Sequence, residues 1–303
     1  MNIPILKSDA VLLFTSFVWG FAFVAQRVGM NHVGPFTFNG IRFALGSLAL
    51  LPILIMNRRQ RLSAEDSCFV EVQTIKMKNV ILGISLAGLA LFMGASLQQV
   101  GLVYTTAGKA GFITGLYVII VPILGLLWRN RVEKGTWIGP LLAVIGLYLL
   151  SVTEGFMIAF GDLLILGGAF FWASHILIIA RIIPLIRPLK LAVLQYLICS
   201  ILSIIIAFST EHITLQGISQ ASMPILYGGF LSVGVGYTLQ VIGQQNAPPA
   251  HAAVLLSSEA VFAVFGGWLV LGEILSHRGL IGCVFIFSGM LFSQLWRGSL
   301  HLR

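Results

Sequence analysis

The sequence predicts an all-α integral membrane protein with ten transmembrane helices, arranged as two inverted five-helix repeats (5+5). Composition is the first indication: 58% of the 303 residues are hydrophobic and 9% are charged, whereas soluble proteins average about 25% charged residues. The mean hydropathy of +0.98 agrees with this. The chain also contains ten apolar stretches, and uncommon residues recur at fixed offsets between its two halves. These observations together predict a membrane bundle whose basic unit occurs twice.

Each predicted span is an apolar stretch close to the roughly 20 residues that a helix needs to cross the hydrocarbon core. The stretches lie at about 10–30, 36–56, 80–100, 108–127, 137–152, 163–181, 191–208, 224–243, 252–271 and 280–296, and the fifth is the shortest. Tight turns are expected at Tyr104–Thr106 and at Asn246–Ala250, where two prolines cannot continue a helix. The polar stretch Asn57–Asn79 is expected to be a cytoplasmic connector.

The two halves resemble each other when one is shifted along the other. Trp19, Pro35 and Arg42 recur at one constant spacing as Trp172, Pro188 and Gln195, and we call this spacing the long offset. Leu97, Gln98 and Gly101 recur at a smaller constant spacing, the short offset, as Leu239, Gln240 and Gly243. With one further position of slip, Gly139 and Gly146 recur as Gly282 and Gly289. We therefore expect repeats at 1–153 and 154–303. Five spans in each repeat would insert the second copy upside down, a geometry typical of secondary transporters.

The distribution of basic residues predicts the orientation in the membrane. With the N-terminus inside, 14 of the 18 Lys and Arg residues fall on inner segments, at 7, 58, 59, 61, 76, 78, 129, 131, 134, 181, 187, 190, 297 and 303. The outer segments hold only Lys109 and Arg278, while Arg27 and Arg42 fall near the outer ends of spans. The positive-inside rule therefore predicts that both termini are cytoplasmic. The net charge of +8 then reflects topology, and no nucleic-acid partner is expected.

Enzyme signatures are missing from the sequence. Gly234-Val235-Gly236 lacks the third glycine and the strand-turn-helix setting of a dinucleotide site, and Ala107-Gly108-Lys109 lacks the residues that complete a phosphate loop. The six histidines and three cysteines show no metal-ligand spacing. We therefore expect no catalytic residues, no metal and no cofactor, and we do not expect an enzyme.

Glu259 is the acidic residue predicted to lie well inside a span. It falls about eight residues into the ninth stretch, or roughly 12 Å along a helix that rises 1.5 Å per residue. An ionised carboxylate at that depth costs at least about 2.5–3.5 kcal/mol, so it should face water, hold a proton or meet a cation. We expect a proton or cation site there. The alternative is a protonated carboxyl group hydrogen-bonded to a neighbouring helix.

Several polar and aromatic side chains share this predicted depth. The short offset pairs Gln98 with Gln240 and Tyr117 with Glu259, so these residues would flank an axis in the membrane plane. Trp19 and Trp172 lie at mid-span, away from the interfaces where Trp concentrates, and Tyr237 and His175 lie one turn from Gln240 and Trp172. The expected substrate-binding residues are Trp19, Gln98, Tyr117, Trp172, His175, Tyr237, Gln240 and Glu259. For each, packing or an interhelical hydrogen bond is the alternative.

Three basic residues near the outer ends of spans are expected to serve as anchors. Arg27, Arg42 and Lys109 carry long aliphatic stems that can extend the charge toward headgroups. Contact with an anionic substrate is the alternative.

The order of short motifs resembles the drug/metabolite transporter superfamily, and in particular its EamA-type members. These motifs are Phe17-Val18-Trp19-Gly20, Arg42, Tyr104-Thr105-Thr106-Ala107-Gly108 leading to Tyr117-Val118 and Pro122, and Leu271-Gly272-Glu273. The likeness runs from about Ala10 to Trp296. It implies a ten-helix inverted-repeat carrier of the bacterial inner membrane, with a central cavity. Asn130 replaces the glutamate that such proteins often carry after span four, the counterpart of Glu273.

The expected function is secondary transport of small polar or amphipathic metabolites, such as amino acids, by alternating access. Members of the family are typically exporters, and Glu259 would couple transport to protons. The expected partners are a small-molecule substrate and the lipid bilayer, and the protein is expected to be a monomer or a weak homodimer. Two alternatives stay open: an uncoupled facilitator of cationic metabolites, and a lipid-handling or interaction subunit that transports nothing.

Overall fold

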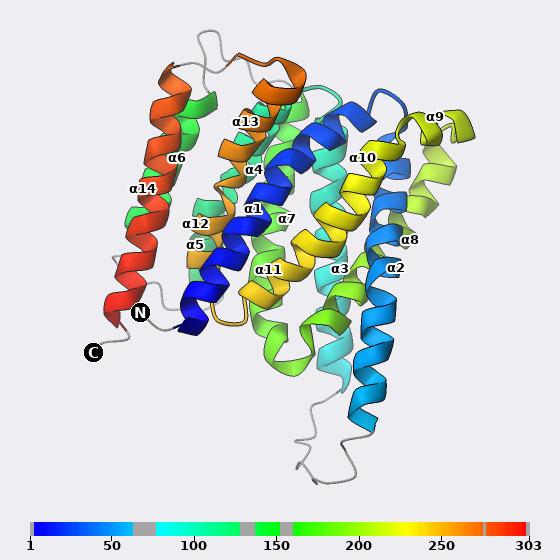
Figure 1. Cartoon of the computed structure of the whole chain (residues 1–303), viewed down its shortest axis with the longest axis horizontal. Coiled ribbons are helices and arrows are strands. Elements are labelled where there is room, and N and C mark those ends of the chain that lie inside the picture. The colour runs from blue at the N-terminus through cyan, green and yellow to red at the C-terminus, as the bar shows by residue number, and fades with distance from the viewer. Residues whose placement is uncertain (1–2, 63–76, 128–136, 152–159, 275–276, 301–303) are drawn as a thin grey trace.

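The structure is a computed structural model of the chain, and it describes residues 3–62, 77–127, 137–151, 160–274 and 277–300. Within these ranges every regular element is a helix (Figure 1). Eight helical stretches in the described part are long and apolar enough to cross a membrane. The fold is therefore the predicted all-helical membrane bundle.

The eight stretches correspond to the first four predicted spans and to the sixth, seventh, eighth and ninth. The helices are α1 (Ile3–Gly29), α2 (Pro35–Leu62), α3 (Met77–Gly101), α4 (Ala107–Gly115) continued by α5 (Tyr117–Leu127), α7 (Phe160–Ile182), α8 (Pro188–Thr210), α10 (Ser222–Leu226) continued by the π-helix η4 (Tyr227–Tyr237) and α11 (Thr238–Gly243), and α12 (Pro249–Leu256) continued by α13 (Glu259–Leu271).

Two further helices occupy the places of the fifth and tenth predicted spans. These are α6 (Ile138–Ser151), with 14 residues, and α14 (His277–Leu300), with 24. Helix α6 is shorter than the roughly 20 residues that a straight crossing needs. Two short helices, η3 (Ile183–Leu185) and α9 (Leu215–Gln220), join α7 to α8 and α8 to α10. The predicted turns at Tyr104–Thr106 and Asn246–Ala250 are confirmed, and most of the predicted connector at 57–79 lies outside the described residues.

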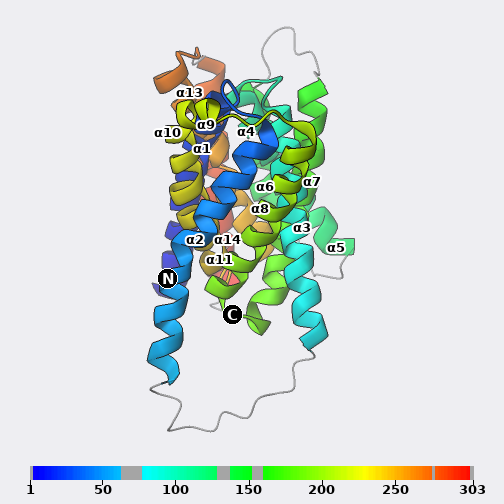
Figure 2. The ribbon, with the colours of Figure 1, turned by 90° about the vertical axis from the view of Figure 1, so that its right-hand side faces the viewer.

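The helices form a bundle with two ends, which we call lower and upper as in Figure 1. Helix α1 begins and α14 ends at the lower end, while α1 finishes and α2 begins at the upper end. The pair α6 and α14 forms one edge of the bundle, and α2 packs against α8 toward the opposite edge (Figures 1 and 2). The middle contains α1, α3, α4, α5, α7, η4, α11, α12 and α13.

The packing is what a twofold axis in the membrane plane would produce. Helix α3 of the first half packs against α7 of the second half. The equivalent of α3 in the second half is η4 with α11, the equivalent of α7 in the first half is α1, and these also pack together. Helices α6 and α14 are equivalent to each other and meet through glycines. A Cβ on Gly146 would lie 2.5 Å from the Gly282 oxygen, and a Cβ on Gly289 would lie 2.7 Å from the Gly139 oxygen. Glycine at these four positions therefore lets the two backbones touch.

The fourth span of each half is broken near its middle. Helix α4 gives way to α5 at Leu116, and α12 gives way to α13 at Ser257 and Ser258, where Ser258 is the equivalent of Leu116 under the short offset. At both breaks the backbone tightens, since Leu116 N–H bonds to the Ile113 oxygen and Ser258 N–H bonds to the Leu255 oxygen, each three residues back. The hydroxyls of both serines also bond to carbonyls three residues back, which bends helices. The apolar stretches at about 108–127 and 252–271 predict continuous helices, so both breaks are a difference from the prediction.

Most of the described helices begin a few residues earlier than predicted, and in α1 and α7 this moves an acidic residue into the helix. The sequence placed the first and sixth spans from about 10 and 163, whereas α1 begins at Ile3 and α7 at Phe160. Asp9 and Asp162 therefore lie within the first turns of these helices, and both are buried. Both lie near the starts of their spans, whereas Glu259 lies well inside the span Pro249–Leu271, as predicted.

Candidate functional site

A polar cavity lies in the middle of the bundle, between helices of both halves. It measures about 30 Å³, which is room for about two water molecules. Helices α1, α3, α4 and α5 of the first half and α7, η4, α11 and α13 of the second half all contribute residues to its wall. Its lining residues are Trp19, Ala22, Phe23, Gln26, Gln98, Thr114, Tyr117, Trp172, Ile176, Ser232, Tyr237, Gln240 and Glu259.

Gln98 is the centre of a hydrogen-bond network in the cavity wall. Its side-chain oxygen accepts a bond from Trp172 Nε1 at 3.0 Å and a longer one from Thr114 Oγ1 at 3.5 Å. Its Nε2 donates to Gln26 Oε1 at 3.1 Å. These bonds join α3 to α1, α4 and α7, so the network ties helices of both halves together.

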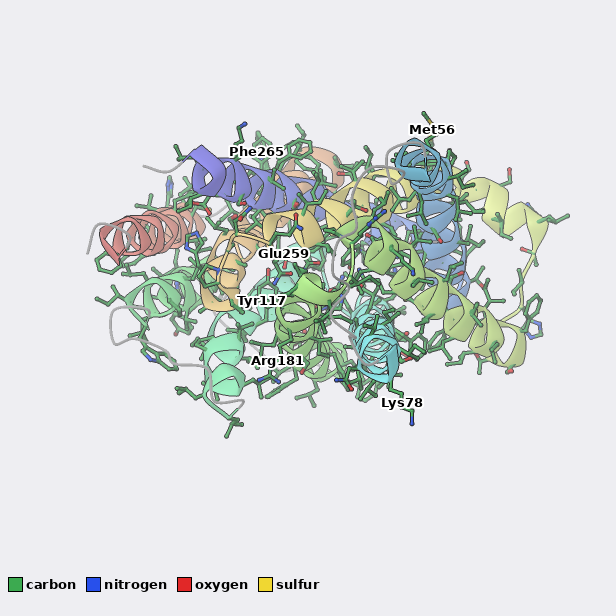
Figure 3. All side chains as sticks on the ribbon, turned by 90° about the horizontal axis from the view of Figure 1, so that it is seen from below. Met56, Lys78, Tyr117, Arg181, Glu259 and Phe265 are labelled. Carbon is green, nitrogen blue, oxygen red and sulfur yellow. The ribbon has the colours of Figure 1, made fainter. Side chains whose placement is uncertain are left out.

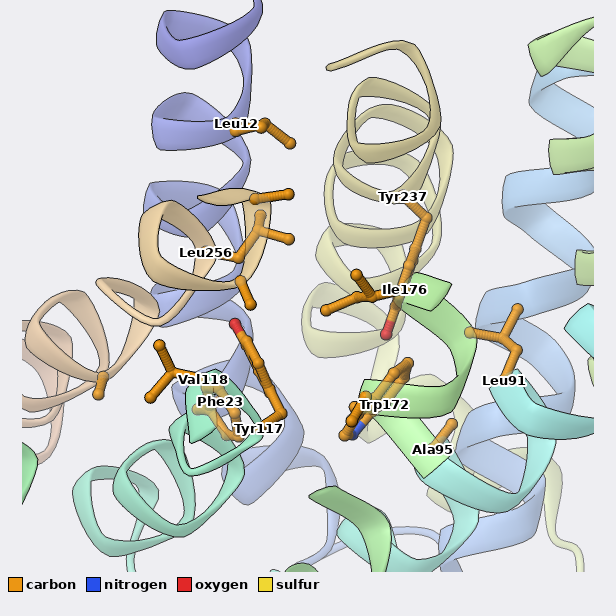
Figure 4. Close-up of a cluster of buried hydrophobic side chains, with 14 of the residues drawn as sticks. Leu12, Phe23, Leu91, Ala95, Tyr117, Val118, Trp172, Ile176, Tyr237 and Leu256 are labelled. Carbon is orange, nitrogen blue, oxygen red and sulfur yellow. The ribbon is translucent and has the colours of Figure 1, made fainter. Parts of the chain in front are cut away.

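Aromatic rings form another part of the wall. Tyr237 lies 4.5 Å from Trp19 and 5.8 Å from Trp172 between ring centroids, and it stacks nearly parallel to Trp172. Trp19 Nε1 donates to the Ser232 backbone oxygen at 3.2 Å. Tyr117, Trp172 and Tyr237 come from three different elements and gather around the same region (Figure 4). Flat rings with polar edges can contact both apolar and cationic parts of a small molecule.

Glu259 and Tyr117 stand at the two helix breaks. Each is the first residue after its break, Tyr117 in α5 and Glu259 in α13. Both are buried, at 2% and 3% exposure, and Figure 3 shows them in the interior of the bundle. Tyr117 and Glu259 interact with each other through their side chains, whereas Gln240 Oε1 has no hydrogen-bond partner within the described part of the chain. Buried polar atoms are normally paired, so Gln240 Oε1 is available to water or to a bound molecule, and the Tyr117–Glu259 pair lines the same cavity.

Seven of the eight predicted site residues line the cavity: Trp19, Gln98, Tyr117, Trp172, Tyr237, Gln240 and Glu259. The eighth, His175, lies outside the lining. Its Nε2 and Gln195 Oε1 are 2.8 Å apart in a fully buried pair, and its ring meets Trp172 edge to face. His175 therefore supports a cavity residue from behind.

Gln26 is the main polar residue of the wall that the sequence analysis missed. It lies seven residues, or two helical turns, after Trp19 in α1, and Ala22 and Phe23 fall between them on the same face. This spacing could have identified it once Trp19 was chosen. Thr114 and Ser232 also line the cavity and were missed, since nothing in the sequence distinguishes them from other hydroxyl residues in apolar helices.

The three expected anchors meet partners within the bundle. Arg42 is 1% exposed, and its guanidinium carbon lies 5.0 Å from the Phe43 ring centre and 5.5 Å from that of Phe38. Lys109 Nζ contacts Asp162 Oδ2 at 2.6 Å, and Arg27 donates to the Leu102 backbone oxygen at 3.2 Å. Anchoring is therefore wrong for Arg42 and Lys109, because helix packing supplied nearer aromatic and acidic partners than the lipid surface.

Carboxylates cap two helices at the upper end. Glu211 accepts bonds from the backbone N–H groups of Phe36 and Thr37, both at 2.8 Å, at the start of α2. Glu273 follows the left-handed Gly272 (φ 68°) and faces the first N–H groups of α4. Partial burial raises the pKa of Glu273 above its ordinary value, although these N–H groups and Arg27 oppose the shift. Both carboxylates satisfy helix N-termini that would otherwise be unpaired.

The lining suits the binding of a small molecule better than a chemical reaction. It combines several rings and amides with one carboxylate, and the described residues contain no group of three potential metal ligands. Pockets for drug-sized ligands usually measure about 300–1,000 Å³. A metabolite can therefore enter this cavity only when the surrounding helices move apart.

Comparisons with known proteins agree with this geometry. The family model described as the EamA-like transporter family matches the chain twice, at residues 6–152 and 159–294. The chain belongs to the EamA-like transporter family. It is thus a multi-pass membrane transporter of the drug/metabolite transporter superfamily and not an enzyme.

Relatives of this family cover nearly the whole chain. An uncharacterized transporter of Archaeoglobus fulgidus is 32% identical over 292 residues, which cover 96% of this chain and 86% of that protein. A probable amino-acid metabolite efflux pump of Salmonella typhimurium is 24% identical, and the match covers 94% of this chain and 93% of that protein. A solved crystal structure superposes with a TM-score of 0.75 at 18% identity, covering 97% of this chain and 99% of that one. This last likeness concerns the fold.

Proposed function

We propose that this protein exports small polar or amphipathic metabolites of the amino-acid class by alternating access. The substrate binds in the central cavity among Trp19, Gln98, Trp172, Tyr237 and Glu259. The two halves then rock against each other so that the cavity opens to one side of the membrane at a time. The amino-acid class is supported by the relative of Salmonella typhimurium, a probable amino-acid metabolite efflux pump.

The observation that carries this proposal is the position and chemistry of the cavity. It lies between equivalent helices of two inverted halves, as in other inverted-repeat transporters. Its walls offer rings for apolar parts of a substrate, amides for hydrogen bonds and one carboxylate for an ammonium group. A lipid-handling subunit would instead be expected to direct Glu259 and the glutamines toward acyl chains, and these side chains line the cavity.

Glu259 is the proposed proton site. Its carboxyl group is buried against Tyr117, with no basic side chain among the described residues that line the cavity, and a carboxyl group buried at this depth is favoured only when it is protonated or meets a cation. A proton and the ammonium group of a substrate would therefore compete for one carboxylate. Such competition couples the movement of one to that of the other.

The proposed topology has ten spans in units of 1–153 and 154–303, in a bacterial inner membrane. Two separate family matches, at 6–152 and 159–294, support the division into units. Described basic residues at the lower end include Lys7, Lys78 and Arg181, of which the last two are labelled in the view from below (Figure 3). We therefore propose that the lower end is cytoplasmic. A monomer or weak homodimer is the proposed assembly.

The test measures flux and proton movement in the same proteoliposomes. The purified protein is reconstituted with a pH-sensitive dye inside, and labelled amino acids are supplied with and without a pH gradient. We expect the wild type to move protons with substrate, whereas Glu259→Gln should exchange internal for external substrate with a lowered apparent affinity and should no longer move protons. Glu273→Gln is the control, because it removes a carboxylate outside the cavity.

Three outcomes would change the proposal. Unaltered coupling in Glu259→Gln at every pH and gradient removes Glu259 from the mechanism. Saturable flux of cationic substrates without proton movement in the wild type indicates an uncoupled facilitator. Absence of flux for all amino acids and amines, in protein that remains folded, contradicts transport of this substrate class.

A further inference from the structure

Two carboxylate–base pairs lie at opposite ends of the bundle. At the lower end, Asp9 Oδ1 in α1 lies 2.9 Å from His251 Nε2 in α12. At the upper end, Asp162 Oδ2 in α7 lies 2.6 Å from Lys109 Nζ in α4. The first contact is a hydrogen bond that becomes an ion pair when the imidazole is protonated, and the second is an ion pair. Each contact joins a helix of one half to a helix of the other.

The two pairs are equivalents under the internal repeat. The long offset, which relates Trp19 to Trp172, also relates Asp9 to Asp162. The short offset, which relates the two cavity glutamines, also relates Lys109 to His251. In both cases an acid on the first span of one half meets a base in the first turns of the fourth span of the other half. Such reciprocal contacts are what an inverted repeat places at the two ends of one pathway.

Both pairs stand at a similar distance from the cavity. Each acid precedes its cavity tryptophan by ten residues, which is about 15 Å along a helix. Lys109 and His251 each precede their equivalent residues, Tyr117 and Glu259, by eight residues, or about 12 Å. One pair therefore lies below the cavity and the other above it, on the same elements that build its walls.

Burial makes these contacts dependent on a closed structure. Asp9 and His251 are 5% and 4% exposed, Asp162 is 3% exposed, and the Lys109 side chain is 23% exposed. Separating a buried acid from its base is strongly unfavourable unless water reaches both groups. Each pair can therefore separate only when its end of the bundle opens and admits water. Both pairs are formed here, which agrees with a cavity that has room for only about two water molecules.

We propose that Asp9–His251 and Lys109–Asp162 are the two gates of the transporter, and that they separate in turn. Opening the lower end breaks Asp9–His251 while Lys109–Asp162 holds the upper end closed, and opening the upper end does the reverse. The four residues position the halves and do not contact the substrate. This inference rests on the proposed alternating access, and it adds the contacts that decide which side is open.

The test measures from which side the cavity can be reached. Ala22 lines the cavity and is small, so Ala22→Cys in a background without the three native cysteines provides a thiol there. In oriented proteoliposomes, a membrane-impermeant thiol reagent is supplied from one side and labelling rates are compared without substrate. Asp162→Asn should raise labelling from the upper side about five- to tenfold and lower it from the other side, and Asp9→Asn should do the opposite.

Exchanged pairs and a control distinguish a gate from general loosening. Lys109→Asp combined with Asp162→Lys, and Asp9→His combined with His251→Asp, should each restore the original balance of labelling. Glu211→Gln removes a carboxylate at the upper end that caps α2, so it should leave the balance unchanged. Opposite shifts that the exchanged pairs reverse support the gates. Equal shifts from both sides, no shift, or failure of both exchanged pairs to restore the balance contradicts them.

This experiment is independent of the substrate. If the protein carried no amino acid, flux would be absent while the labelling pattern would still report the gates. If the gates were wrong, flux could persist while the two asparagine variants labelled alike. The amide variants keep the shape of the original side chains, and a thermal melting curve for each establishes that the labelled protein is folded.

Discussion

Gln98 and Gln240 provide a direct test of the hydrogen-bond network, because they are equivalent residues with unequal partners. Gln98→Ala leaves Trp172 Nε1 and Gln26 Oε1 without the bonds they now make. Gln240→Ala deletes the same atoms, but Gln240 Oε1 has no partner within the described residues. Loss of packing is therefore similar in the two variants, and their difference isolates the network.

The magnitude follows from the groups that lose Gln98 as a partner, which are chiefly Trp172 Nε1 and Gln26 Oε1, with the longer bond from Thr114 Oγ1 as a smaller contribution. Each buried unpaired group costs about 1–3 kcal/mol, but interhelical bonds in membranes average only about 0.6 kcal/mol, and the adjoining cavity can supply water. We therefore expect Gln98→Ala to be less stable than Gln240→Ala by about 1–3 kcal/mol. With roughly 2–4 °C per kcal/mol for a large domain, the Tm difference should be several degrees.

Thermal unfolding in detergent, followed by the fraction of protein that still elutes as a single species, measures this difference. Equal Tm values for the two variants, or a lower value for Gln240→Ala, would refute the network as described. Gln98→Glu serves as a second comparison, because it keeps an acceptor for Trp172 but removes the donor to Gln26.

Three further expectations follow from single positions. Burial raises the pKa of Glu273 above its ordinary value of 4.5, so the folded state favours the protonated carboxyl group. The stability of the wild type should therefore fall as the pH rises from 4.5 through the raised pKa. Glu273→Gln should flatten that part of a curve of Tm against pH. Arg42→Met removes a buried guanidinium group whose Nε and Nη2 have no hydrogen-bond partner in the described part of the chain. The Tm should therefore rise by the equivalent of about 1–3 kcal/mol. A lower Tm would show that other groups compensate the charge. Gly236→Ala places a Cβ 2.6 Å from Trp19 Nε1, so it should displace the Trp19 ring at a cost of about 1–3 kcal/mol. Substrate binding should weaken in a ligand-stability assay. Unchanged binding would show that Trp19 does not contribute to the substrate site.

The sequence was most informative where physics constrains a whole helix. Apolar length identified the eight long spans, and the helices related by the constant offsets of Trp19, Gln98 and Gly146 pack in matching pairs. Depth and isolation led to Glu259, and this residue lines the central cavity. A helix that crosses lipid must be apolar over its whole length, and an ionisable residue inside it is rare. Both features can be recognised in the sequence without knowledge of how the helices pack.

The sequence was least informative where the outcome depends on which neighbour a side chain meets. Hydropathy averaged over a whole span does not register the breaks at Leu116 and Ser257, because the stretches that they interrupt remain strongly apolar on average. Lys109 was expected at the lipid surface, yet Asp162 of the opposite half lies within 2.6 Å. His175 has the depth and the helical spacing expected of a cavity residue, but its Nε2 is paired with Gln195 Oε1 outside the cavity lining. Only the assembled helices decide such pairings.

Substrate exchange across the membrane tests the central claim most directly. Proteoliposomes are loaded with an excess of one unlabelled amino acid, and entry of the same labelled amino acid is followed in the absence of any ion gradient. Alternating access through a single cavity predicts that internal substrate accelerates entry, that the rate saturates, and that replacing Trp172 by Leu lowers apparent affinity. Flux that rises without saturation and is indifferent to internal substrate would contradict the account.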